Sequence, residues 1–103
     1  MDTPPLTPDP ASFTDTAICV RFVLLPDSLA LDWAGPAEVL RSANRVCQAL
    51  GQPPRFDVGF IGPEPEPLTS VGVRLTGVAP LPEPVHASTT RPTWVVLVGN
   101  PDD

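Results

Sequence analysis

The stretch from residue 21 to residue 50 constrains the fold most, because it reads as a strand, a turn and a helix in direct succession. Residues 17–25 (AICVRFVLL) are almost continuously apolar, which is typical of a strand buried on both faces of a parallel sheet. Pro26 ends this run. Gly35 and Pro36 are then expected to open a helix, since a proline suits the first helical position, where its missing N–H would be unpaired anyway.

The helix is predicted over residues 36–50. Its apolar residues recur at helical spacing and form one stripe, expected to face a core: Val39, Leu40, Ala43, Val46, Cys47 and Leu50. Gly51 should end the helix, and Pro53 and Pro54 prevent it from resuming. Residues 55–61 (RFDVGFI) follow as a second strand, which completes a β-α-β unit.

The rest of the chain predicts a smaller set of elements. Residues 68–71 and 73–76 are expected to form a short hairpin that turns near Gly72. Residues 77–92 are rich in proline and show no helical period, and residues 93–98 (TWVVLV) predict a third buried strand. The fold class is therefore α/β, with a doubly wound, flavodoxin-like parallel sheet in the order β-α-β, hairpin, β. The sheet is expected to be incomplete, because three core strands are accompanied by one helix and a parallel sheet needs cover on both faces.

Proline and charge are concentrated at the two ends of the chain. Four of the sixteen prolines lie in the first ten residues, so residues 1–16 are expected to form a disordered, proline-rich tail, and residues 101–103 a short acidic one. Five of the twelve acidic residues lie in these tails, which leaves seven against six arginines between residues 17 and 99. Lysine is absent and no basic cluster occurs, which argues against nucleic-acid binding through this chain.

Targeting and metal-binding signals are missing from the sequence. It has no secretory signal pattern and no apolar run of membrane-spanning length, so we expect a cytoplasmic protein without a membrane contact. Cys19 and Cys47 lack metal-ligand spacing and are interpreted as thiols in a reducing compartment. His86 stands alone in a proline-rich stretch. Neither a metal site nor a cofactor is predicted.

The segment around Asp32 resembles the opening of the DJ-1/PfpI superfamily (class I glutamine amidotransferase-like), and more closely its GlxA-like branch fused to AraC-type helix-turn-helix domains. That branch carries the pattern L-D-x-x-G-P-x-E-V-F/L after its first strand. The residues that match it here are Leu31, Asp32, Gly35, Pro36, Glu38, Val39 and Leu40. The S-A-N-R of residues 42–45 matches as well, and the resemblance extends over residues 17–100.

The resemblance implies the ligand-sensing domain of a bacterial, GlxA-like AraC-family transcriptional regulator, truncated before its DNA-binding module. It also implies a small-molecule ligand and, for the full-length family member, a homodimer. The family's reactive cysteine would lie beyond residue 103, so this chain is not expected to be an enzyme. Two alternatives remain open: a truncated stand-alone DJ-1/PfpI enzyme of the isocyanide hydratase or amidase type, and a small non-catalytic α/β protein.

The same resemblance supplies the candidate site residues. Asp32 matches the family's active-site acid, and Gly99 and Asn100 stand where the family has a P-G-G turn, so these three are the ligand-binding candidates. Gly35, Pro36 and Glu38 form the helix-start motif. Asp32 could instead be a turn residue that accepts hydrogen bonds from nearby backbone N–H groups. Glu38 could serve the helix alone, through the helix dipole and Arg41 or Ser42.

Overall fold

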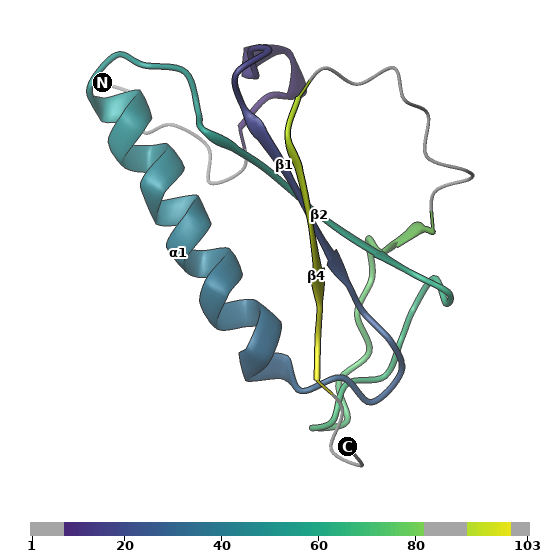
Figure 1. Cartoon of the computed structure of the whole chain (residues 1–103). Coiled ribbons are helices and arrows are strands. Elements are labelled where there is room, and N and C mark those ends of the chain that lie inside the picture. The colour runs from purple at the N-terminus through teal and green to yellow at the C-terminus, as the bar shows by residue number, and fades with distance from the viewer. Residues whose placement is uncertain (1–7, 82–90, 100–103) are drawn as a thin grey trace.

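The computed structural model describes residues 8–81 and 91–99, which build a parallel sheet with one long helix on one side (Figure 1). The strands are β1 (Ile18–Val23), β2 (Phe56–Gly62), β3 (Ala79–Pro80) and β4 (Thr93–Leu97), in the order β3-β2-β1-β4. All three pairings are parallel. The mixed α/β class and the parallel sheet are confirmed, and the arrangement is compatible with an incomplete flavodoxin-like fold.

Strand β1 is the centre of the core. It lies between β2 and β4, and Val20 pairs with Val58 on one side and with Trp94 on the other. Val20, Phe22 and Leu24 are at most 1% exposed, and the rings of Phe22 and Phe60 stack with centroids 5.5 Å apart. The apolar run that predicted a buried strand is therefore confirmed at this position.

Helix α1 (Ala30–Ala49) begins six residues earlier than predicted, so the assignment of Pro36 to the first helical position is wrong. Pro36 lies inside the helix, where its missing N–H costs one hydrogen bond, the one to the carbonyl of Asp32. A residue before proline normally avoids helical geometry because its Cβ meets the proline ring, and Gly35 has no Cβ. The Gly-Pro pair is thus tolerated within the helix rather than placed before it.

The end of α1 matches the prediction. Gly51 adopts a positive φ of 73°, a conformation that glycine enters without steric cost. The N–H of Gln52 donates to the Cys47 carbonyl at 2.9 Å, and that of Gly51 donates to Gln48 at 3.0 Å. This pattern of paired bonds closes the last turn in the manner typical of glycine-terminated helices.

The apolar stripe of α1 faces the sheet only in part. Trp33, Ala37 and Leu40 pack against the core. Three other apolar residues are 60–70% exposed, contrary to the prediction that one stripe buries them all: Val39, Val46 and Leu50. The stripe is wider than the sheet contact, so its far side turns toward solvent beside β4.

Asn44 fastens α1 to the start of β2. Its side chain is 3% exposed, and its Oδ1 accepts hydrogen bonds from the N–H groups of Arg55 and Phe56, both at 2.8 Å. Its Nδ2 donates to the Phe56 carbonyl, also at 2.8 Å. The first residues of β2 have no neighbouring strand on the side away from β1, and the Asn44 side chain supplies the hydrogen bonds that such a strand would make. The S-A-N-R motif therefore has a structural role.

Strand β4 forms as predicted but is not buried. It is the outer strand of the sheet, and Trp94, Val95 and Leu97 are 48%, 61% and 79% exposed. Burial was predicted from its apolar sequence, and that prediction is wrong. Val95 and Leu97 point to the sheet face opposite α1, and β4 has a neighbouring strand on one side only among the described residues. On the sheet face opposite α1, Asp57 Oδ2 lies 3.0 Å from Arg91 and 3.6 Å from Arg21.

The connection from β2 to β3 turns at Gly72 as predicted but does not form a two-stranded hairpin. A single antiparallel bridge joins Leu68 to Arg74, and Gly72 has a φ of 84°. The short β3 was not predicted. Within the predicted disordered tail, Pro10–Ser12 form a 3-10 helix capped by Asp9, so order begins earlier than the composition indicates.

Candidate functional site

The carboxyl ends of β1 and β4 are linked directly, at the position where ligands bind in open parallel sheets. The N–H of Leu29 donates to the Gly99 carbonyl at 3.1 Å. Two further bonds tie the turn after β1 to the loop after β2: Asp27 N–H to the Leu68 carbonyl at 2.7 Å, and Ser70 N–H to the Ser28 carbonyl at 3.0 Å. Asp27 accommodates this turn with a positive φ of 65°.

Asp32 and Gly99, two of the three predicted ligand-binding residues, lie against each other. A Cβ added to Gly99 would lie 2.9 Å from Oδ2 of Asp32, so a larger residue there would displace the carboxylate. Asp32 comes from the first turn of α1, and Gly99 follows β4. The third predicted residue, Asn100, lies outside the described residues.

Asp32 lies at the surface of the molecule. Its side chain is exposed, and Leu31 beside it is 80% exposed. Within the described part of the chain no hydrogen bond to the Asp32 carboxylate is present. Its interpretation as a turn residue that accepts from backbone N–H groups stays a prediction.

Glu38, the last residue of the predicted helix-start motif, forms an ion pair along the helix. Arg41 Nε donates to Glu38 Oε2 at 2.7 Å, as the interpretation without a ligand predicted. Gly35 and Pro36 lie within α1, and the space around Gly35 is open to 4 Å. These three residues therefore do not converge on Asp32 and Gly99.

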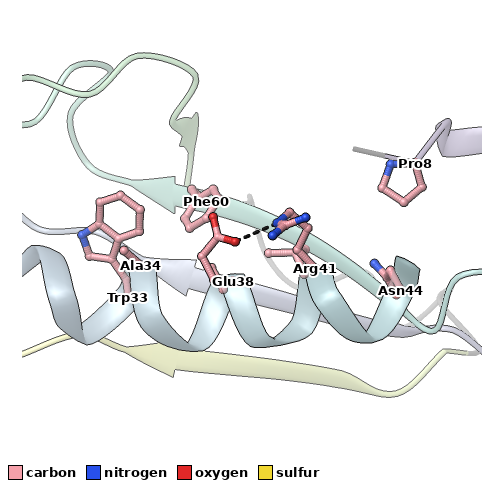
Figure 2. Close-up of a pocket in the computed structure, with 9 residues that line it drawn as sticks. Pro8, Trp33, Ala34, Glu38, Arg41, Asn44 and Phe60 are labelled. Atoms are coloured by element: carbon pink, nitrogen blue, oxygen red, sulfur yellow. Dashed lines mark hydrogen bonds and ion pairs between the residues drawn. The ribbon is translucent and has the colours of Figure 1, made fainter. Parts of the chain in front are cut away.

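A second candidate site lies between α1 and β2, and we call it the α1–β2 groove (Figure 2). It combines two adjacent cavities, of about 240 and 170 Å3, which share Trp33 and Phe60 as walls. The edge of the Trp33 ring meets Phe60 with centroids 5.5 Å apart. Figure 2 shows Glu38 and Arg41 on the next turns of the helix, with their ion pair beside Phe60.

Sequence reasoning missed the α1–β2 groove. Nothing in the spacing of Trp33 and Phe60 along the chain shows that two cavities remain beside them. A usable signal was present, since Glu38 and Arg41 are charged residues one turn apart on the helix that carries Trp33. Their meeting with Phe60 depends on the position of β2 under the helix.

The described residues contain neither a cluster of metal-ligating side chains nor a helix suited to span a membrane. No group of three or more His, Cys, Asp or Glu side chains is placed to hold a metal ion. No described helix combines the length and apolar character needed to cross a membrane. Cys19 and Cys47 are free, half-buried thiols, and His86 lies outside the described residues.

Comparison with known proteins adds no relative. No family model matches the chain, and searches of curated proteins and of solved structures found no similar protein.

Proposed function

We propose that this chain forms part of the ligand-sensing domain of a GlxA-like AraC-family transcriptional regulator. The proposal starts from the L-D-x-x-G-P-x-E-V-L sequence of residues 31–40 and the S-A-N-R that follows. In this interpretation the chain binds a small molecule and leaves DNA contacts to a separate module. The near-neutral charge of residues 17–99 agrees with that division.

The observation that carries the proposal is the contact between Asp32 and Gly99. These residues are 67 positions apart, by subtraction of their numbers, yet they meet where β1 and β4 end. The resemblance assigns both positions to the family's site, and the parallel pairing of β1 with β4 brings the start of α1 and the end of β4 together. An exposed carboxylate beside a glycine backbone is suited to hold a polar ligand group.

The described residues also support a larger domain. The sheet face opposite α1 carries the Arg21–Asp57–Arg91 cluster, and β4 exposes apolar side chains on both of its faces. Parallel sheets are usually covered on both faces, so further elements would complete this one. A stand-alone DJ-1/PfpI enzyme would share all of these features. It would differ from a regulator in the rest of the protein, which would carry a cysteine on a strand-to-helix turn and no helix-turn-helix pair.

Sequencing of the coding DNA in frame beyond Asp103, with the intact mass of the native protein from its source cells, tests the proposal. We expect an open frame on the order of two hundred further residues that ends in a basic helix-turn-helix pair, at about 100–200 residues per domain. A frame that encodes a cysteine on a strand-to-helix turn and then stops would favour the enzyme. A stop codon directly after Asp103, with a native mass equal to the 10.9 kDa of this chain, would refute the proposal.

A further inference from the structure

We propose that the α1–β2 groove binds a small, uncharged, planar ligand: an aromatic ring that carries an amide or a similar paired donor and acceptor. This inference goes beyond the proposed function, because it assigns a second site, away from Asp32 and Gly99, and a class of ligand to it. The α1 residues that line this site lie between positions 33 and 44.

The dimensions and walls of the groove suit one ring with a short substituent. Its larger cavity measures about 240 Å3, which is below the range of about 300–1,000 Å3 typical of sites for drug-sized ligands. Trp33 and Phe60 present aromatic surface, and Val58 and Ala37 complete an apolar floor. A flat ring can pack against these walls, whereas a flexible chain would lose more conformational freedom on binding.

Trp33 contributes the surface of its ring to the groove. Its Nε1 has no hydrogen-bond partner among the described residues, but it has almost no accessible surface, so a ligand in the groove does not reach it. The polar contacts of a bound ligand are therefore assigned to Glu38 and Arg41.

The Glu38–Arg41 pair favours a neutral ligand with both a donor and an acceptor. Arg41 uses one N–H for Glu38 and makes no other hydrogen bond within the described residues, so its terminal nitrogens remain free to donate. Glu38 is 65% exposed at its side chain and can accept a further bond. An amide matches both groups, with its carbonyl on Arg41 and its N–H on Glu38, while a carboxylate can accept from Arg41 but offers no donor to Glu38.

The other surfaces of the molecule lack this combination. The cavity of about 310 Å3 between α1 and β4 is lined by apolar residues alone, including Val39 and Trp94. Neither Asp32 nor Gly99 lines any of the three cavities. The α1–β2 groove is therefore the place where enclosed volume, aromatic walls and directional polar groups occur together in the described chain.

Titration of the 15N-labelled 103-residue protein with benzamide tests the inference, because the chain has two tryptophans and hence two indole N–H signals. We expect a saturable shift of the Trp33 signal and none of the Trp94 signal, with Trp33→Phe used to assign them. Trp94 is an internal control, since it lines the apolar cavity beside β4. A shift of Trp94, equal unsaturable shifts of both signals, or no shift at all would each overturn the proposal.

Two matched arginine variants and a second probe sharpen the result. Arg41→Ala should weaken benzamide binding about tenfold or more through loss of a charge-assisted hydrogen bond. Arg45→Ala, one turn further along α1 and outside the groove, should leave it unchanged. Benzoate should bind at least about tenfold more weakly than benzamide, because it offers no donor to Glu38. Equal affinities for the two probes, or equal effects of the two variants, would contradict the assigned ligand class.

The failures of the two proposals can be told apart. Saturable benzamide binding in a protein whose gene encodes no helix-turn-helix pair would leave the groove site standing and remove the regulatory role. A gene that does encode the pair, with no benzamide binding, would overturn the groove site alone.

Discussion

Strands β1 and β4 have similar compositions and opposite environments. In β1 the side chains of Val20 and Phe22 are at most 1% exposed, while in β4 those of Val95 and Leu97 are 61% and 79% exposed. The difference has two sources. Val20 and Phe22 point to the sheet face that α1 covers, whereas Val95 and Leu97 point to the opposite face. In addition, β1 has a neighbouring strand on both sides and β4 on one side only among the described residues. An apolar run thus indicates that a strand suits a buried position, without showing whether the position is buried.

The edge position of β4 is unusual for its sequence. Edge strands normally carry charged residues or proline that discourage pairing with another chain. The residues of β4 (TWVVL) include neither. Val39 and Val46 of α1, also exposed, extend the apolar surface on the helix side of the sheet. Strand β4 therefore has the sequence of an inner strand in the place of an outer one.

The largest expected effect comes from alanine substitutions that compare the two strands. Phe22→Ala should lower the free energy of unfolding by about 3–5 kcal/mol, because it removes a fully buried ring and leaves a cavity. Val95→Ala should change it by less than about 0.5 kcal/mol, because that side chain is mostly in water already. Urea unfolding followed by circular dichroism measures both values.

The change in the free energy of unfolding on Val95→Ala tests whether β4 is as exposed in solution as the structure shows. A loss of about 1 kcal/mol or more on Val95→Ala would mean that β4 is covered in solution and that its exposure is not a property of the folded protein. Equal losses for both variants would remove the distinction altogether.

An intermediate effect is expected where α1 meets β2, the best-fastened corner of the sheet. Asn44→Leu leaves two N–H groups and one carbonyl at the start of β2 without their partner, at about 1–3 kcal/mol for each group that water does not reach. Since residue 55 is exposed, we expect a total loss of about 2–4 kcal/mol in the same unfolding experiment.

Two further variants test whether hydrogen bonds are the cause. Asn44→Asp keeps the oxygen that accepts from two backbone N–H groups, but it buries a charge and sets its other oxygen against the Phe56 carbonyl, so it should also destabilise the protein. Ser42→Ala, on the exposed side of the same helix, should be close to neutral. Asn44→Leu with unchanged stability would show that packing, and not this side chain, sets the position of β2.

The sequence predicts those features that depend on neighbouring residues in the chain. The end of α1 at Gly51 follows from local backbone preference, and the three long strands follow from apolar runs. The start of α1 was missed because the Gly35-Pro36 pair resembles a helix opening, and its toleration inside the helix depends on an absent Cβ. Leu29, the residue before α1, donates its N–H to Gly99, which follows the distant strand β4.

The candidate sites also depend on contacts between distant parts of the chain, which the sequence alone does not reveal. Asp32 and Gly99 could be paired in advance only through the family resemblance, since no local rule brings them together. The α1–β2 groove was not predicted, because a cavity depends on how closely α1 approaches Val58 and Phe60 of β2. Spacing along the helix placed Arg41 within reach of Glu38, but did not show that Trp33 and Phe60 would border a cavity beside this pair.

The smallest change in stability is expected from charges added to β4, and it tests whether its exposed edge has consequences. The double variant Val95→Lys and Leu97→Lys places two charges on the sheet face opposite α1. Both side chains are mostly in water there, so each substitution should change the free energy of unfolding by less than about 0.5 kcal/mol. Association between chains should change more, because lysine on an edge strand opposes strand pairing. Sedimentation velocity over a range of protein concentrations should show association of the wild type and a monomer for the variant. If the wild type stays monomeric at every concentration, the edge of β4 does not mediate association between chains. The difference between β1 and β4 would then be one of side-chain burial only.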